Sequence, residues 1–400
     1  MMQDMKPPAA IQAKRIVRRT ARLLQRIRRK ALGINERVVT LQPDDAPRGR
    51  VLFSYILDPL LDVERPVPLS HTHFWESRQM ALTFRELGFA VDCLHWTNRR
   101  FVPRLPYNVY VDVRRNFDRL APQLPAGCVK VFHADTAHHA VHNGAQRRRL
   151  AELEQRRGIR LDPFKLVEVN RAAELADRVT LLGNDFTAGT FRYAGKPIRS
   201  IPISTPLLFP EPASKPFDAA RKRFLWFGSE GFVHKGLDLV LDAFASMPEM
   251  ELTVCGPLDA EPAFEAAYAR ELYGMPNIHT TGWIDIESPA FRRILDTSLA
   301  LVYPSCSEGG GGCVVGCMHA GLIPVVTPEA SVNVIPENGV VLPTPSVDAI
   351  RNAVRAMAGM SPERLRGISM AAWSFARANH TRERFAAAYR VFAESITGRL

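Results

Sequence analysis

A carboxylate followed by four glycines is the feature of this chain best suited to chemistry. Glu308 precedes the glycines, and a stretch with helical spacing follows them from Cys313 to Ala320. The four are Gly309, Gly310, Gly311 and Gly312. A glycine loop that opens a helix can bind an anion, because no side chains shield its backbone N–H groups and the helix dipole adds partial positive charge. A tight turn in an α/β sheet is the alternative, but four glycines exceed what a turn needs.

Apolar runs flank this loop and have the character of buried strands. They cover 299–303 and 323–326. A third such run, 223–228, is followed by a loop that includes Ser229 and by a helix that begins near Lys235. Strand, helix and strand in this order predict parallel βαβ units. Lys235 is either an exposed charge at a helix start or a phosphate ligand, and the glycine loop downstream favours the second role.

The N-terminal half repeats this pattern. Strands are expected at 50–56, 90–94 and 129–134, with a helix over 71–87 between the first two. A parallel sheet follows from this order. The strand at 129–134 runs into polar residues that would lie at its carboxyl end, where function collects in open α/β sheets. These residues are His133, Asp135, His138, His139 and His142, and they are either solvent-facing or a potential metal site.

Length and composition indicate two globular domains. The chain has 400 residues, of which 46% are hydrophobic and 23% charged. Prolines crowd 202–216 and mark a linker. We therefore predict an N-terminal segment over 1–45, one domain over 46–205, a second over 206–380 and a terminal helix over 381–400. Neither a secretory signal nor an apolar run long enough to span a membrane is evident, so a cytoplasmic protein is expected.

The motifs around the glycine loop resemble those of the retaining, family-4-like glycosyltransferases of the GT-B fold. The matching pattern reads Pro-Ser-x-x-Glu-Gly-x-Gly, then a helix that ends in Gly, then Pro-Val-Val. Matching positions are Pro304, Ser305, Glu308, Gly309, Gly311, Ala320, Gly321, Pro324, Val325 and Val326. The resemblance covers roughly residues 50–400 and is strongest over 224–327. It implies two Rossmann-like, doubly wound domains that face a cleft, with the N-terminal domain for the acceptor and the C-terminal one for the nucleotide-sugar.

The resemblance also implies roles for single residues. Lys235 corresponds to the lysine that meets the donor diphosphate, and Glu308 is the expected catalytic carboxylate. His133 or His138 corresponds to a histidine near the donor sugar; His133 is taken as the catalytic candidate. Further donor-binding positions are Gly228, Ser229, Gly282, whose neighbourhood cradles the base, the four glycines and Cys313.

Two departures from the family pattern weaken the expected nucleotide site. The family has an arginine directly after the strand-end glycine, and here Ser229 stands there. The family also has a second glutamate eight residues after the first, which holds the ribose, and here that position is Gly316. One phosphate cation and one ribose contact are therefore missing from the expected set.

The predicted function is transfer of a hexosyl-type sugar from a nucleotide-sugar to a hydroxyl acceptor, with retention and without a metal or cofactor, in envelope or polysaccharide synthesis. A lipid-linked acceptor is one candidate. Two alternatives remain: a non-catalytic GT-B-like binding protein and a sugar-nucleotide epimerase. Cys306, Cys313 and Cys317 cluster near the glycine loop, but neither a CxxC pair nor a suitable histidine completes a zinc pattern, so no metal is expected.

The N-terminal segment carries most of the basic character of the chain. The net charge is +11, and residues 1–50 alone hold 13 basic and 4 acidic side chains. Nine of the basic residues lie between Lys14 and Lys30, with apolar residues at helical spacing among them. A basic amphipathic helix of this kind suits an anionic membrane, here the inner face of the cell membrane. A packed structural helix and a nucleic-acid arm are the alternatives; no interleaved aromatic residues support the second, so no nucleic-acid partner is expected.

Overall fold

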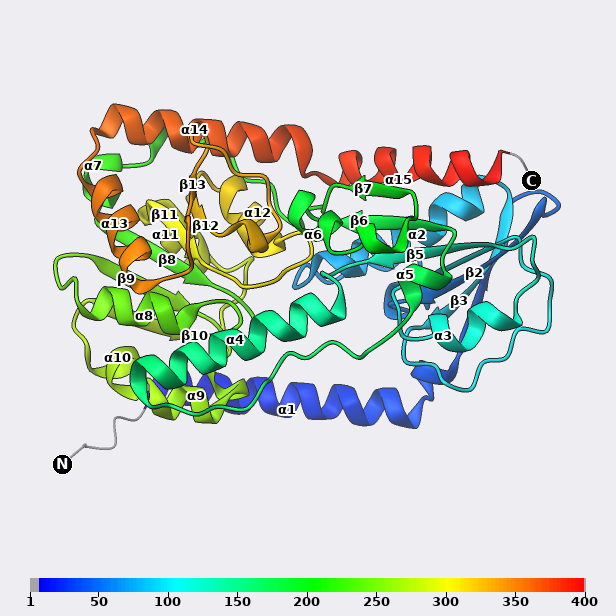
Figure 1. The fold of residues 1–400 in the computed structure, drawn as a ribbon, viewed down its shortest axis with the longest axis horizontal. Helices are drawn as coiled ribbons and strands as arrows, with labels where there is room; N and C mark the ends of the chain where they lie inside the picture. Colours follow the sequence, from blue (N-terminus) through cyan, green and yellow to red (C-terminus); the bar gives the residue numbers. More distant parts are fainter. Residues whose placement is uncertain (1–6, 399–400) are drawn as a thin grey trace. The chain divides into compact units, whose positions relative to one another are not determined.

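The chain forms two compact α/β units, described here from a computed structural model that covers residues 7–398 (Figure 1). Unit 1 comprises the described residues up to Ala21, together with Ala140–Val167 and Leu207–Ala378. Unit 2 comprises Arg22–His139, Glu168–Pro206 and the described residues from Asn379 onward. Each unit is built on its own sheet of mostly parallel strands, which confirms the predicted α/β class with two Rossmann-like domains.

The sheet of unit 1 has six parallel strands in the order β10-β9-β8-β11-β12-β13. The strands are β8 (Arg223–Phe227), β9 (Glu251–Cys255), β10 (Ile278–Gly282), β11 (Ala300–Tyr303), β12 (Ile323–Val326) and β13 (Val340–Val341). Renumbered along the chain, this order is 3-2-1-4-5-6, which is the Rossmann arrangement. The order reverses between β8 and β11, and ligands of such sheets bind outside the carboxyl ends of the strands at this point.

Helices pack on both faces of this sheet and bury a continuous apolar core. They are α4 (His139–Arg157), α7 (Phe217–Ala220), α8 (Leu237–Ala245), α9 (Pro262–Ala267), α10 (Ala269–Gly274), α11 (Pro289–Thr297), α12 (Gly312–His319), α13 (Val347–Ala358) and α14 (Pro362–Asn379). The core includes the fully buried rings of Trp226, Phe244 and Tyr268. Such a core holds the loops at the strand ends in fixed positions.

The sheet of unit 2 has seven strands in the order β1-β3-β2-β4-β5-β6-β7. They are β1 (Val38–Leu41), β2 (Gly49–Tyr55), β3 (Phe89–His95), β4 (Val109–Asp112), β5 (Val129–Ala134), β6 (Arg178–Leu182) and β7 (Ile198–Ile201). Only β1, on one edge, runs antiparallel to its neighbour. The parallel strands follow the flavodoxin-like order 2-1-3-4-5-6, with the reversal between β2 and β4.

Short helices and the last helix of the chain cover the sheet of unit 2. They are α2 (Thr72–Glu86), α3 (Phe117–Leu120), α5 (Ala172–Leu175), α6 (Asp185–Gly189) and α15 (Arg382–Thr397). The helix α15 packs along α2 through edge-to-face ring pairs, with Trp75 against Phe385 at 5.8 Å and Phe84 against Tyr389 at 6.1 Å between centroids. The C-terminal helix is therefore part of the core of unit 2.

Most of α4 and the loop after it belong to unit 1, although they follow strand β5 of unit 2 in sequence. Arg149 donates a buried hydrogen bond to the carbonyl oxygen of Pro304, directly after β11. Arg156 and Arg157 pair with three carboxylates of unit 1, at 2.6–2.8 Å from Asp238, Asp242 and Glu271. A single boundary at residue 205 therefore does not separate the two units, because Ala140–Val167 belongs to unit 1.

Two side chains of α4 fix the loop that follows it. The amide of Asn143 both donates to the carbonyl of Val167 and accepts from its N–H, each at 2.8 Å. A ring nitrogen of His142 lies 2.7 Å from the carbonyl oxygen of Lys165. These contacts to backbone atoms determine where the side chain of Lys165 is presented.

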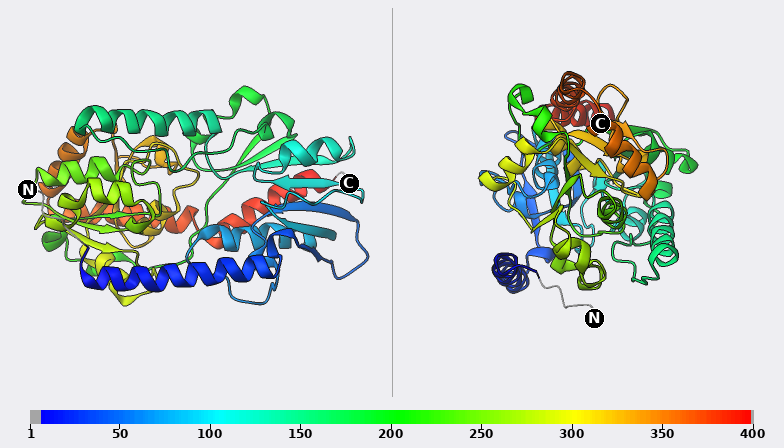
Figure 2. Two further views of the ribbon diagram at one scale, coloured as in Figure 1. Left: turned by 90° about the horizontal axis from the view of Figure 1, so that it is seen from below. Right: turned by 90° about the vertical axis from the view of Figure 1, so that its left-hand side faces the viewer.

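The basic N-terminal segment forms one continuous helix, α1 (Ala9–Ala31), drawn in blue in Figure 2. Its arginines face acidic residues: Arg15 lies 2.5 Å from Glu265, Arg18 lies 2.6 Å from Asp259, and Arg29 pairs with Asp58. The apolar stripe is exposed instead; Ile16 retains 67% and Leu24 61% of their accessible surface. Of the helices in residues 7–398, none is long and apolar enough to cross a membrane.

Replacing Asn143 by alanine should loosen the loop that carries Lys165. Both backbone groups of the half-buried Val167 lose their partner, which costs about 1 kcal/mol of stability. Hydrogen exchange by mass spectrometry should show faster exchange of the Val167 amide, with the strands of unit 1 unchanged. The exposed Asn35→Ala is the matched control and should alter neither. Unchanged exchange across residues 160–168 in Asn143→Ala would contradict this role.

Candidate functional site

The loops after β8 and β11 bring the two central predicted residues together. These strands flank the point at which the strand order of unit 1 reverses. The loop after β8 carries Lys235 and the loop after β11 carries Glu308, and Lys235 Nζ lies 2.7 Å from Glu308 Oε1. Lys235 retains only 4% of its accessible surface, which excludes the alternative of an exposed charge at a helix start.

Neutral hydroxyls complete the surroundings of the pair. The hydroxyl of Tyr303 accepts from Lys235 Nζ at 2.8 Å and donates to Glu308 Oε1 at 2.9 Å. The hydroxyl of Ser305 donates to the same carboxylate oxygen at 3.0 Å. Glu308 Oε1 therefore has three donors, while no hydrogen bond is recorded for the second oxygen, Oε2, among the described residues.

Electrostatics keep both partners charged. Burial by itself would raise the pKa of Glu308, but the positive charges of Lys235 and Lys165 outweigh it and hold the pKa far below the ordinary carboxyl range. Burial by itself would lower the pKa of Lys235, but the negative charge of Glu308 outweighs burial and raises this pKa above its ordinary value. At neutral pH the site therefore contains a carboxylate and an ammonium group rather than their neutral forms.

A second lysine belongs to this site, and sequence reasoning did not find it. Lys165, on the loop after α4, interacts with the side chain of Lys235 and with the charge of Glu308. The neighbouring charge of Lys235, followed by burial, lowers the pKa of Lys165 to about 8. Two lysines beside one carboxylate leave a net positive charge that suits an anion. The missing arginine at Ser229 was the only signal in the sequence that another cation had to be present.

The glycine loop needs its glycines for its shape. Gly310 and Gly311 have φ values of 95° and 57°, in the left-handed region that side chains disfavour. A Cβ atom on Gly311 would lie 2.5 Å from the carbonyl oxygen of Ala330 and from the side chain of Val332. The helix α12 begins at Gly312, so the N–H groups of its first turn lie next to this loop.

The remaining predicted donor positions lie in unit 1. Gly228 follows β8, and a Cβ there would lie 3.2 Å from Lys235 Cδ. Ser229 is exposed and Cys313 is half-buried in the first turn of α12. Gly282 ends β10 in a left-handed conformation, with Ile11 of α1 packed against it. The structure thus groups Lys235, Glu308 and the glycine loop, while Gly282 ends a strand on the edge of the same sheet.

Gly316 lies in the middle of α12 with open space beside it. A Cβ atom built there would meet no atom within 4 Å. A larger side chain would fit, so the absence of the family carboxylate is not a consequence of crowding. The ribose contact that this carboxylate supplies in the family has no counterpart at position 316.

His133 lies in unit 2, at the carboxyl end of β5. Its ring is fully buried, Nδ1 lies 2.9 Å from the hydroxyl of Thr180, and Nε2 has no partner among the described residues. Burial lowers its pKa to about 4, so the ring is neutral at pH 7. The ring of Tyr55, whose hydroxyl is likewise buried without a partner, lies 5.7 Å away. His138 instead contacts the hydroxyl of Tyr193 at 3.1 Å.

The other histidines and the cysteines do not assemble into a metal centre in the described part of the chain. No group of three or more potential ligands lies close enough together within residues 7–398. His142 belongs to unit 1, where its ring lies 4.6 Å from that of His234. All six cysteines are free thiols.

Residues 221–359 match the family described as Glycosyl transferases group 1. The matched range contains β8 to β13 and therefore Lys235, Glu308 and the glycine loop, but not Lys165. No curated protein matches the chain. Together with the fold, the family match supports a glycosyltransferase enzyme.

Solved glycosyltransferase structures share the fold at low sequence identity. Anabaena HepE in complex with UDP has a TM-score of 0.56 and 11% identity, with 88% of this chain and all of that chain covered. A glycosyltransferase from Rickettsia africae has a TM-score of 0.55 and 10% identity, with 87% of this chain and 98% of that chain covered. S. aureus TarM has a TM-score of 0.51 and 10% identity, with 72% of this chain and 54% of TarM covered. This chain therefore spans about half the length of TarM. These similarities identify the fold as GT-B.

Removing Lys235 should destabilise the protein, and removing its partner as well should recover part of the loss. Lys235→Ala leaves a largely buried carboxylate without its main partner, which costs about 3 kcal/mol. The double variant Lys235→Ala/Glu308→Gln should unfold at a higher denaturant concentration than Lys235→Ala alone, because the uncompensated charge is gone. The exposed Lys222→Ala serves as control and should leave unfolding unchanged. A double variant less stable than Lys235→Ala would mean that the pair does not control this site.

Proposed function

We propose that this protein is a glycosyltransferase that moves a sugar from a nucleotide-sugar donor to a hydroxyl acceptor, with retention of configuration and without a metal. The observation that carries the proposal is the Lys235–Glu308 pair, at the strand-order reversal of a Rossmann-like sheet and directly before the glycine loop. HepE, which has the same fold, binds UDP and glucose. A nucleoside-diphosphate sugar is therefore the donor class that we assign to this site.

In this proposal the lysines and the glycine loop bind the donor diphosphate. Lys235, Lys165 and the N–H groups at the start of α12 supply positive charge where the leaving diphosphate gains negative charge. Preorganised charges of this kind often make the largest contribution to catalysis. Lys165 takes over the part of the missing arginine at Ser229, from a different segment of the chain. The protein itself then neutralises the leaving group, which is why no metal is required.

Glu308 is assigned to the hydroxyls of the donor sugar. Its Oε1 atom is held by Lys235, Tyr303 and Ser305, so the carboxylate is fixed in orientation. Oε2 remains for hydrogen bonds from the sugar. Because the carboxylate is ionised, those bonds are charge-assisted and strong enough to orient the anomeric carbon. The neutral ring of His133 is the catalytic candidate that we propose for unit 2.

A non-catalytic donor-binding protein is the second candidate, because Gly316 removes the family ribose contact. Calorimetric titration with UDP and dUDP, followed by hydrolysis and transfer assays over a panel of nucleotide-sugars, separates the two. An enzyme releases the nucleoside diphosphate from one donor of the panel, whereas a binding protein only binds it. Without any nucleotide binding, the proposed function is wrong. Equal affinity for UDP and dUDP is the expected consequence of Gly316.

The pKa of Lys165 gives donor binding a predictable pH dependence. Lys165 carries its charge below a pKa of about 8 and loses it as the pH rises through that value. UDP affinity should therefore fall between pH 7 and pH 9.5, by about tenfold for the loss of one charged contact. Lys165→Met should bind UDP more weakly at pH 7 and should lack this fall. Lys222→Met, an exposed lysine, should behave as the wild type; a Lys165→Met variant with the full pH dependence would contradict the assignment.

We also propose that α1 attaches the protein to an anionic membrane, consistent with a lipid-linked acceptor in envelope or polysaccharide synthesis. The helix contacts the protein through Arg15, Arg18 and Arg29 and, near its start, through the buried Ile11, while Ile16 and Leu24 remain exposed. Basic side chains that are exposed along the same helix are Lys14, Arg26, Arg28 and Lys30. Apolar groups with exposed cations beside them match the interface of an anionic bilayer.

Sedimentation with vesicles tests this attachment. The protein should bind phosphatidylglycerol vesicles, less so at high salt, and should not bind phosphatidylcholine vesicles. Ile16→Gln/Leu24→Gln should reduce binding more than tenfold, because each buried aliphatic side chain contributes about 1.5–3 kcal/mol. Val391→Gln, which changes an exposed residue of α15, is the control. Equal binding of both variants would leave α1 as a structural helix.

A further inference from the structure

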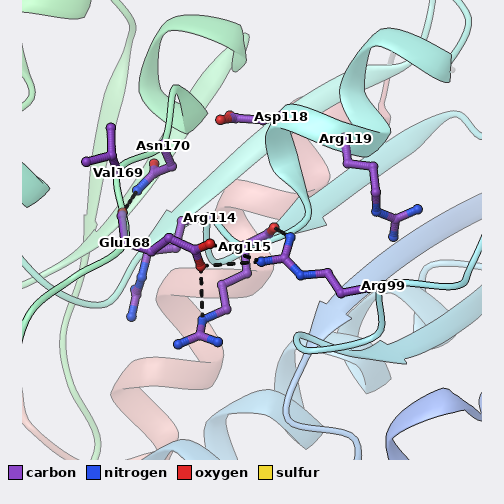
Figure 3. A pocket seen from close by; sticks show the side chains of 8 residues that line it. All are labelled: Arg99, Arg114, Arg115, Asp118, Arg119, Glu168, Val169 and Asn170. Atoms are coloured by element: carbon purple, nitrogen blue, oxygen red, sulfur yellow. Dashed lines mark hydrogen bonds and ion pairs between the residues drawn. The ribbon is translucent and has the colours of Figure 1, made fainter.

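A second charged pocket lies in unit 2, far in sequence from the Lys235–Glu308 site (Figure 3). It has a volume of about 90 Å³, and four arginines and two carboxylates are among its lining residues. Arg99 follows strand β3, and Arg114 and Arg115 follow strand β4. These two strands flank β2 on either side, so the pocket lies at the carboxyl ends of strands next to the reversal of strand order, where open α/β sheets bind ligands.

Two of the arginines converge on one exposed carboxylate. Arg99 Nη2 lies 3.3 Å from both oxygens of Glu168, and Arg115 Nε lies 3.9 Å from one of them. Figure 3 shows Glu168 between the two guanidinium groups. These distances exceed those of a strong charge-assisted hydrogen bond, and the side chain of Glu168 is 55% exposed. Glu168 is thus a loosely held anion that an external one can displace.

The third arginine is fixed by an unusual backbone conformation. Arg114 has a φ of 118°, which a non-glycine residue rarely adopts. The buried carboxylate of Asp112 holds this conformation by accepting from the N–H groups of Arg114 and Asn116, each at 3.0 Å. The guanidinium groups of Arg114 and Arg115 lie 5.9 and 4.5 Å from the ring of Trp96. Strained residues that the surrounding structure holds in place occur preferentially at binding sites.

The remaining charged residues are occupied by the fold. Arg119 donates to the carbonyls of Phe101 and Asn98, and in Figure 3 its guanidinium points away from Glu168. Asp118 accepts from the N–H of Arg171 at 2.9 Å and lies apart from the arginines in the same view. Arg114 pairs with Asp135 on its other side. The pocket therefore presents Arg99 and Arg115 to a ligand, with Glu168 as the single carboxylate between them.

We propose that this pocket binds a phosphate group carried by the acceptor. Two guanidinium groups that meet at one point match the oxygens of a phosphate, with which arginine forms paired hydrogen bonds. The phosphate takes the place of Glu168 between Arg99 and Arg115. This assignment rests on the proposed function and adds to it that the acceptor is a phosphorylated compound, bound by unit 2, while the donor is bound by unit 1.

Calorimetry on the full chain at low salt tests the pocket with glucose 6-phosphate, glucose and inorganic phosphate as probes. Glucose 6-phosphate should bind and glucose should not. Arg99→Gln/Arg115→Gln should weaken binding at least about tenfold, the effect of losing one or more charge-assisted contacts. Arg100→Gln, which removes the adjacent charge that pairs with Glu36 outside the pocket, should have no effect. Glu168→Gln should strengthen binding several-fold, because it removes the negative charge that competes with the phosphate for both arginines.

Three results would overturn the proposal: equal weakening by Arg100→Gln, no strengthening by Glu168→Gln, or tighter binding of inorganic phosphate than of the ester. The last would indicate a site for the free ion rather than for an acceptor. UDP affinity, measured separately, should be the same in Arg99→Gln/Arg115→Gln as in the wild type. If no variant bound UDP, only the donor site in unit 1 would be refuted. The pocket in unit 2 would still be tested, because glucose 6-phosphate binding by Arg99→Gln/Arg115→Gln and by Arg100→Gln is compared without UDP.

Discussion

The salt bridge between Lys235 and Glu308 is the interaction on which the site of unit 1 depends. Neither charge is stable in a largely buried position without the other, so the loops after β8 and β11 must meet at this point. The reversal of strand order between these strands makes the meeting possible. Tyr303 and Ser305 then satisfy the carboxylate oxygen that faces the lysine. The left-handed glycines downstream allow the chain to turn from Glu308 into α12 within a few residues.

The same site draws on a segment that the sequence places elsewhere. The helix α4 follows a strand of unit 2 but contacts unit 1 through a row of arginines. Because Asn143 and His142 bond to the backbone of the loop after α4, Lys165 is presented to the pair. The first half of the chain thus supplies a cation, Lys165, to the proposed diphosphate site. This explains how a protein with Ser229 in place of the family arginine can keep two positive charges there.

Both sheets carry charged residues near the point where the strand order reverses, but the two sites differ in burial and in the strength of their contacts. In each, a loop next to the reversal of strand order carries a cation that pairs with a carboxylate: Lys235 with Glu308 in unit 1, and Arg115 with Glu168 in unit 2. The lysine pair is largely buried and tightly bonded, which suits a group whose charge changes during reaction. The arginine pocket is more exposed and loosely bonded, which suits recognition of a group that stays the same. The two sites divide the proposed reaction between the units.

The sequence alone determined the features that depend on neighbouring residues. Apolar runs and glycines correctly predicted β8, β11, β12 and the loop before α12. The motifs in these segments resemble those of GT-B glycosyltransferases, and this resemblance predicted the fold. The short strands β1, β4 and β7 escaped sequence analysis, because four residues are too few for a clear period and their partners lie far along the chain. Lys165 and the pocket around Arg115 were equally invisible, since single basic residues in irregular segments have no local pattern. Only the tertiary structure decided which charges meet, because burial and the order of strands in a sheet arise from contacts between distant segments.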